Sequence, residues 1–276
     1  CPRGNATGGN ATGCVATAMA QIMKYWSTVY DSEIYASPSG FWNYLTKGFG
    51  SHSYTPASHP EYGEQSVDFG DATYDWRNMT NTYSSSNTDA QKEAVAKLMY
   101  HCGVSVNMNY GEKNTSSGAD TEDVAYALQN YFNYSQSVHY ITRASIVDET
   151  GQEDLEQWKN MLKAELTATP PRPIQYKGRR IVEGDQTTGH SFICDGYKIE
   201  DNNDMFHFNW GWGGSADAWF VITGLSYPLE QAAILGIQPI TYDAQPSGLE
   251  VSVENQNVTL TWTSVNSASS YNVYNL

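Results

Sequence analysis

Two residues of this chain, Cys14 and His190, have side chains that together can perform thiol chemistry. Cys14 follows a repeated GNATG at the point where the sequence turns apolar, and the residues after it are spaced as in a helix. A cysteine in the first turn of a helix lies near unpaired backbone N–H groups, which stabilise the thiolate over the thiol. We therefore expect Cys14 to be a nucleophile near neutral pH. The alternative interpretation is a small buried apolar residue.

His190 stands in TTGHSFICDGY, where alternation puts it on the same strand face as Phe192 and Cys194. A short polar turn separates this strand from MFHFNW, so the two strands are expected to pair as a hairpin. Pairing brings the NWGW segment close to His190. The side-chain oxygen of Asn209 can then fix the imidazole tautomer, and Trp210 can exclude water. The combination predicts a thiol and imidazole site.

The elements that must position these residues run from helices to strands along the chain. A helix starting at Cys14 is predicted by an apolar stripe at steps of four, three and four, formed by Val15, Met19, Ile22 and Trp26. Further helices are expected across 88–101, 120–131 and 153–166, and strands across 191–197, 205–210 and 218–222. Residues 31–87 are expected to form long loops with short elements. Helices followed by strands predict an α+β protein with a helical lobe and an antiparallel sheet lobe.

A change of pattern near residue 240 divides the chain into two expected parts, a catalytic domain over 1–240 and a segment over 241–276. The second part alternates apolar and polar residues in three runs, around Val251, Val258 and Tyr271. This pattern is typical of the first strands of a fibronectin-type or Ig-like sandwich. About 30 residues are too few for a complete sandwich, so a truncated β domain is expected, with a simple C-terminal β-hairpin as the alternative.

Composition and charge exclude several classes of function. The chain has 276 residues, 40% of them hydrophobic, and a net charge of −15, which repels nucleic acid. The sequence contains no run of about 18 apolar residues, so no membrane span is predicted. Four cysteines at positions 1, 14, 102 and 194 lack the spacing of a metal site, so neither a metal nor another cofactor is expected. Because the sequence starts at Cys1 without a signal peptide, we expect a mature or trimmed form.

Five blocks of the sequence resemble the streptopain family of papain-like cysteine peptidases, which bacteria secrete. They are TGCVATAMAQIMKYW, LMYHCGVSVNMNYG, NYSQSVHYITRASI, GHSFICDGY and HFNWGWGGSADAWF, in the family's order over most of the first 240 residues. The resemblance implies a papain-like α+β fold of two lobes. It also implies that Cys14 is the nucleophile, that His190 is its general base and later acid, and that Trp210 packs against and orients the histidine.

The resemblance extends to the residues around this pair. Asn209 stands where a papain-like third catalytic residue is sought, and backbone amides near Cys14 would form the oxyanion hole. The loop at 109–120 resembles the family's substrate-side loop, which makes Ser117, Gly118 and the backbone of Gly189 candidate substrate contacts. This chain departs from the family at Lys177, where family members carry a glutamine that helps to bind the oxyanion. Gln175 or Gln186 is the alternative donor.

The function implied by the resemblance is a secreted endopeptidase that hydrolyses proteins through an acyl-enzyme on Cys14. Its partners would be protein or peptide substrates, with an apolar residue preferred at the second position before the cleaved bond, and an inhibitory propeptide. Cys14 must then be free, which leaves at most one disulfide among the other three cysteines. Two alternatives stay open: a thiol amidase or transglutaminase-like acyl transferase, and a non-catalytic surface binding protein. His101, His139 and His207 are interpreted as structural.

Overall fold

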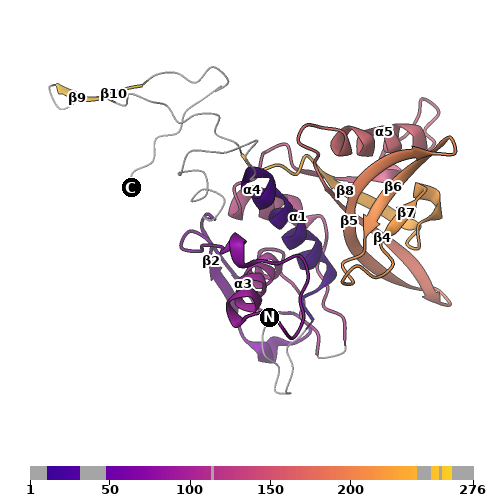
Figure 1. The fold of residues 1–276 in the computed structure, drawn as a ribbon, viewed down its shortest axis with the longest axis horizontal. Helices are drawn as coiled ribbons and strands as arrows, with labels where there is room; N and C mark the ends of the chain where they lie inside the picture. Colours follow the sequence, from indigo (N-terminus) through magenta and orange to yellow (C-terminus); the bar gives the residue numbers. More distant parts are fainter. Residues whose placement is uncertain (1–10, 32–47, 113–114, 241–249, 255–256, 263–276) are drawn as a thin grey trace. The chain divides into compact units, whose positions relative to one another are not determined.

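The computed structural model describes residues 11–31, 48–112, 115–240, 250–254 and 257–262. The chain forms two compact units, Cys1–Pro239 and Ile240–Leu276 (Figure 1). In the second unit, β9 (Glu250–Glu254) and β10 (Asn257–Thr261) pair as an antiparallel hairpin, with Val251 opposite Leu260. These strands match the first two alternating runs of the sequence. The third run, around Tyr271, lies outside the described residues.

The first unit begins with a helical lobe. Its described elements are α1 (Cys14–Asp31), α3 (Asp89–Ser105), α4 (Asp123–Tyr131) and the antiparallel pair β1 (Ser51–Tyr54) and β2 (Gln65–Asp68). The apolar stripe of α1 is at most 2% exposed at Val15, Met19, Ile22 and Trp26. The stripe forms the centre of this lobe's core. Burying a large apolar side chain contributes about 1.5–3 kcal/mol to stability, so the stripe fixes which face of α1 turns inward.

Helix α3 starts one residue later than predicted and ends four residues later. Thr88 caps it, because the Thr88 hydroxyl accepts a hydrogen bond from the Gln91 N–H and the Thr88 N–H donates one to the Gln91 side-chain oxygen. The helix continues to Ser105 because Cys102 and the residues that follow are buried against the core. Packing therefore extends the helix beyond the predicted pattern.

The second lobe is a six-stranded antiparallel sheet in the order β3-β8-β4-β5-β6-β7. The strands are β3 (His139–Thr142), β4 (Ile174–Glu183), β5 (Gln186–Glu200), β6 (Asn203–Asn209), β7 (Ala218–Phe220) and β8 (Leu229–Leu235). The predicted hairpin is β5–β6, and its turn at Asp201 and Asn202 has positive φ at both residues, as the tightest hairpin turns require. Strand β8 lies between β3 and β4, and none of these three strands was predicted from the sequence.

One face of this sheet is covered by α5 (Leu155–Leu166), which lies across the strands in Figure 1. Trp158 and Leu162 of α5 are fully buried, and the Trp158 indole donates a hydrogen bond of 3.2 Å to the Tyr176 hydroxyl on β4. Short 3₁₀ helices complete the fold at Pro60–Tyr62, Trp76–Asn78, Arg143–Ser145 and Ile222–Gly224.

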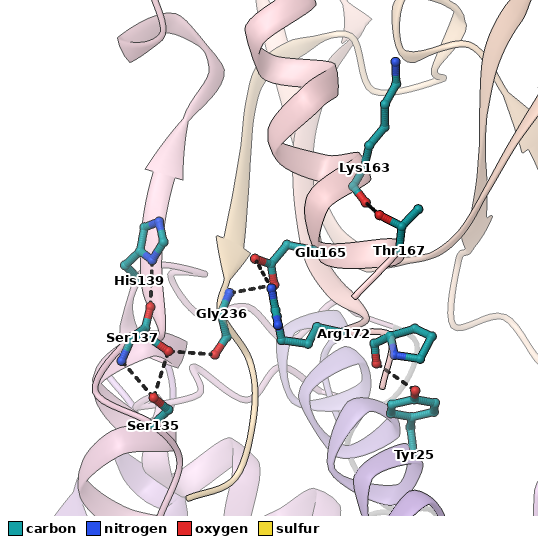
Figure 2. Close-up of polar contacts among 10 residues, drawn as sticks. Tyr25, Ser135, Ser137, His139, Lys163, Glu165, Thr167, Arg172 and Gly236 are labelled. Carbon is teal, nitrogen blue, oxygen red and sulfur yellow. Dashed lines mark hydrogen bonds and ion pairs between the residues drawn. The ribbon is translucent and has the colours of Figure 1, made fainter. Parts of the chain in front are cut away.

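The two lobes are joined through α1 and the segment that follows α5. Helix α1 packs on β4 and β5. The Tyr25 hydroxyl donates a hydrogen bond of 2.7 Å to the Pro171 carbonyl (Figure 2). Figure 2 also shows Glu165 at the end of α5, whose carboxylate accepts hydrogen bonds from the Arg172 guanidinium and from the Gly236 N–H at the end of β8. These contacts hold helix and sheet in one arrangement, on which the site depends.

Candidate active site

A cleft of about 620 Å³ opens where the start of α1 meets the sheet. Its walls are residues 11–21 around the start of α1, the loop 116–121, parts of β4 and β5, and the turn at 210–212. Cys14 and His190 both line it, although 176 positions separate them in the sequence. The α1–sheet packing therefore brings together the two residues that the sequence singles out.

Cys14 is the first residue of α1 and is partly exposed in the cleft. Gly13 before it has φ +85°, and a Cβ there would lie 2.5 Å from the Met108 sulfur, so the position suits glycine alone. The Gly13 carbonyl accepts hydrogen bonds from the N–H and the hydroxyl of Thr17. Thr12, two residues before the helix, contacts the Thr17 hydroxyl at 3.2 Å.

His190 is held by a backbone carbonyl. Its Nε2 lies 2.9 Å from the Trp210 carbonyl oxygen. A carbonyl can only accept, so Nε2 carries the hydrogen and Nδ1 is the basic nitrogen of the neutral ring. The sequence predicted that the Asn209 side chain would do this. Instead its oxygen accepts a hydrogen bond of 2.9 Å from the Gly211 N–H, closing the turn that aims the Trp210 carbonyl at the ring.

Aromatic rings surround the imidazole. Trp210 stacks parallel to it with ring centres 6.2 Å apart, as expected, and is 2% exposed. Trp212 lies closer, at 5.1 Å, and is 48% exposed at the mouth of the cleft. Trp212 was not predicted as a site residue, although its place two residues after Trp210 was a usable signal. Asp217 has no such signal, yet its carboxylate accepts a hydrogen bond of 2.9 Å from the Trp210 N–H.

The charge states of the pair follow from burial. Burial raises the pKa of the Cys14 thiol, and backbone N–H groups of Ser191, Val15 and Cys14 itself offset only part of this. The position at the helix start predicted a lowered pKa for Cys14, but the pKa is raised because desolvation outweighs the effect of the N–H groups. Burial also lowers the pKa of His190, although the Trp210 carbonyl opposes that shift. Burial therefore favours the neutral form of both groups.

Gln175 takes a position beneath the cleft. It is fully buried and is not among the lining residues. Its side-chain N–H₂ donates to the Val15 carbonyl at 3.1 Å and to the Ser191 hydroxyl at 3.0 Å. Gln175 thus holds Val15 and Ser191, the residues that follow Cys14 and His190, in place. Because Gln175 is buried beneath the cleft, it cannot contact the substrate directly. Gln186, the other expected donor, is exposed in the β4–β5 hairpin and does not line the cleft.

The other expected substrate contacts, Ser117, Gly118 and Gly189, all line the cleft. The Ser117 hydroxyl is buried and donates to the Ala11 carbonyl at 2.7 Å, which braces the loop before Gly13. The N–H and C=O of Gly118 both pair with Asn109. Gly189 is exposed on β5 beside His190.

The remaining candidate residues have structural partners. His207 contacts the Asp195 carboxylate at 2.5 Å, outside the cleft. His101 contacts the Tyr74 hydroxyl at 2.8 Å, and His139 contacts the Ser137 carbonyl (Figure 2). All three cysteines in the described ranges, at positions 14, 102 and 194, are free thiols. No group of three or more His, Cys, Asp or Glu residues that could hold a metal ion occurs in those ranges.

Known proteins are similar to this chain in sequence and in fold. A model of the peptidase C10 family matches residues 1–220. Streptopain of Streptococcus pyogenes serotype M1 is 34% identical over 245 residues, covering 83% of this chain and 53% of its own length. The thiol protease/hemagglutinin PrtT of Porphyromonas gingivalis is 31% identical over 245 residues, covering 84% of this chain and 24% of its own length. This chain therefore spans about half the length of the streptopains that it matches.

Solved structures give the same result. The active wild-type cysteine protease interpain A of Prevotella intermedia has a TM-score of 0.68 at 37% sequence identity. The match covers 83% of this chain and 85% of the interpain A chain. A prointerpain A fragment from the same organism has a TM-score of 0.66 at 35% identity, with 87% and 67% covered. These similarities confirm the α+β architecture and the resemblance drawn from the sequence. The chain belongs to the peptidase C10 family.

Proposed function

We propose that this chain is the catalytic part of a cysteine endopeptidase, with Cys14 as nucleophile and His190 as general base and acid. The observation that carries the proposal is the fixed imidazole: Nε2 is bound to the Trp210 carbonyl, and both Cys14 and His190 line one cleft. This arrangement leaves Nδ1 to exchange protons with the thiol. Membership of the peptidase C10 family supports the same chemistry.

The proposed reaction has two stages. Nδ1 of His190 takes the thiol proton as the Cys14 sulfur attacks the peptide carbonyl carbon. The oxyanion that forms lies at the start of α1, where the Cys14 N–H has no partner within the helix. Nδ1–H then protonates the departing amine, the C–N bond breaks, and a thioester remains on Cys14. Water, deprotonated by His190, attacks the thioester carbon, the C–S bond breaks as His190 returns that proton to the Cys14 sulfur, and the carboxylic acid is released.

Features of the cleft support a protein substrate. The cleft is open, and its lining combines backbone groups with aromatic side chains, as binding an extended peptide requires. Gly189 and Gly118 both line it, and Trp212 in its lining is exposed. The relative named prointerpain A is a pro-form, and we extend this to an inhibitory propeptide here. Secretion from a bacterial cell is part of the proposal, since the named relatives are bacterial.

No helix in the described part of the chain has the length and apolar character needed to cross a membrane.

The proposal is tested with denatured casein. Reduced protein is incubated with casein and new peptide termini are identified by mass spectrometry, with Cys14→Ala in parallel. We expect cleavage by the intact protein alone, with apolar residues at the second position before the cut. Release of ammonia or cross-linked casein without new termini would indicate the amidase or transglutaminase-like alternative. Binding of casein without any chemistry would indicate a binding protein.

A further inference from the structure

Two cations lie side by side on the sheet wall of the cleft. Lys177 and Arg179 of β4 both line it, and their spacing of two places them on one face of the strand. Gly178 between them faces the other way, where a Cβ would collide with the Tyr227 backbone. Gly178 is paired with His190 across the β4–β5 ladder, so the imidazole leaves the sheet on the face of Gly178, whereas the two cations share the face of Gln175, which contacts α1.

Neither cation is neutralised by a close carboxylate. Among the described residues no carboxylate lies within 4.0 Å of the Lys177 ammonium, which sits 5.5 Å from the centre of the Tyr140 ring. The Arg179 guanidinium donates two hydrogen bonds to the Thr187 hydroxyl, at 3.0 and 2.7 Å. Its ion pair with Glu230 is long, at 3.8 Å, and the Glu230 side chain is 66% exposed, so the pair is screened by water.

This local charge contrasts with that of the whole chain. Acidic residues outnumber basic ones thirty to fifteen, yet β4 presents two cations to the cleft. One acidic side chain, the exposed Asp120, lines the opposite wall. A peptide lying between these walls would meet the two cations along the strand next to β5. Such a wall favours a carboxylate on the peptide and disfavours a cation.

We propose that Lys177 and Arg179 select peptide substrates that carry an aspartate or glutamate side chain near the cleaved bond. The inference rests on the proposed peptidase function and adds a substrate class to it. An extended peptide advances about 3.4 Å per residue, and the cations lie in register with the strand positions on either side of His190. The acidic side chain therefore belongs within about three residues of the cleaved bond.

The test uses a neutral peptide taken from a cleavage site in casein. A single Glu, or the matched Gln, is moved through each position on both sides of the cleaved bond. We expect one position at which the Glu peptide has a kcat/KM about tenfold above the Gln peptide. The ratio should fall to about one in the double variant Lys177→Gln, Arg179→Gln, and it should shrink for the wild type at high salt.

Two control variants separate this effect from a change in overall charge. Lys198→Gln removes a cation from β5 outside the cleft, and it should keep the preference. Lys177→Glu should reverse it, so that a Lys peptide is cleaved better than the Glu peptide. Fluorescence anisotropy with Cys14→Ala repeats the comparison as binding, without any chemistry.

Three outcomes would overturn the inference. In the first, wild-type protein cleaves Glu and Gln peptides equally at every position. In the second, the double variant keeps the preference. In the third, Cys14→Ala binds the two peptides equally. Failure of the proposed function looks different, because then even the neutral peptide is not cleaved.

Discussion

The Nε2 atom of His190 lies 2.9 Å from the carbonyl oxygen of Trp210, which comes twenty residues later in the chain. This bond assigns the imidazole tautomer, because the carbonyl accepts and Nδ1 is then left as the base. The carbonyl is aimed by the turn at Gly211, whose φ is +74° and whose N–H is bound by the Asn209 side chain. A backbone turn therefore holds the proposed base in its working orientation.

Replacing the glycine of this turn should impair catalysis more than stability. Gly211→Ala forces a side chain into positive φ, 3.4 Å from the Thr17 methyl group, and should displace the Trp210 carbonyl. We expect kcat/KM to fall at least about tenfold, while unfolding free energy drops by about 1–2 kcal/mol. Gly213→Ala is the matched control, since its φ is +66° and the space around it is open. Equal losses of kcat/KM in both variants would contradict this role of the turn.

The dependence of kcat/KM on pH should be a broad plateau. The active pair holds one proton between Cys14 and His190, and a second proton must form a buried imidazolium. Because burial lowers the pKa of His190, the acid limb should lie below the ordinary histidine value of 6.5. Loss of the last proton leaves a buried thiolate. Because burial raises the pKa of Cys14, the alkaline limb should lie above the ordinary value of 9.0.

The substrate for this measurement is a peptide without titratable groups, so that both limbs of the pH profile report groups of the enzyme. An acid midpoint above 6.5, or an alkaline midpoint below 9.0, would show that charge stabilisation outweighs burial in this site.

Gln175 should act as a positioning residue for the pair. Gln175→Leu removes the donor to the Val15 carbonyl and the Ser191 hydroxyl, so kcat should fall by about 10- to 100-fold with little change in KM. Loss of these buried hydrogen bonds should also cost about 1–3 kcal/mol of unfolding free energy. Gln231→Leu is the control, because Gln231 is equally buried in the sheet but bonds the Tyr176 hydroxyl and Arg143 away from the cleft.

Urea unfolding and steady-state kinetics on both variants separate the two roles. If Gln231→Leu lowers kcat as much as Gln175→Leu, the effect is one of general stability.

Acid should weaken the helical lobe through His101. Burial lowers the pKa of His101 from 6.5 to about 4, and the nearby Lys97 charge adds to the shift. Between these two values the unfolded chain binds more protons than the folded one, so unfolding free energy falls as pH decreases through this range. The full shift corresponds to about 3 kcal/mol, and partial exposure of the ring reduces the expected loss to about 1–2 kcal/mol.

The measurement is urea unfolding near pH 7 and near pH 4.5, for wild type and His101→Gln. The variant should lose less stability on acidification than the wild type. Parallel losses in the two proteins would assign the acid sensitivity to other groups.

Patterns within single elements were predictable from the sequence. The stripe from Val15 to Trp26 fixed α1, and alternation with a polar turn fixed the β5–β6 hairpin, because both signals are local. Strand β8 was missed because LEQAAIL carries small alanines and its partners β3 and β4 lie far away in the sequence. Its strand conformation is set by those neighbours.

Some features of the candidate site could not be predicted from the sequence. The partner of His190 is a backbone carbonyl, and every residue has one, so no side-chain pattern marks Trp210 as that partner. The pKa of Cys14 depends on how deeply the sheet buries the thiol, which is a tertiary property that the helix start does not reveal.

In the proposed mechanism, Cys14 carries the acyl group while His190 moves the proton. The most direct test is intact-protein mass spectrometry after rapid mixing with an activated ester of a blocked amino acid, followed by acid quench and peptide mapping. We expect one added acyl group, mapped to Cys14, that forms in step with the burst of released alcohol and is absent in Cys14→Ala and strongly slowed in His190→Ala. Turnover of the ester with Cys14 unmodified, or an acyl group on another residue, would contradict it.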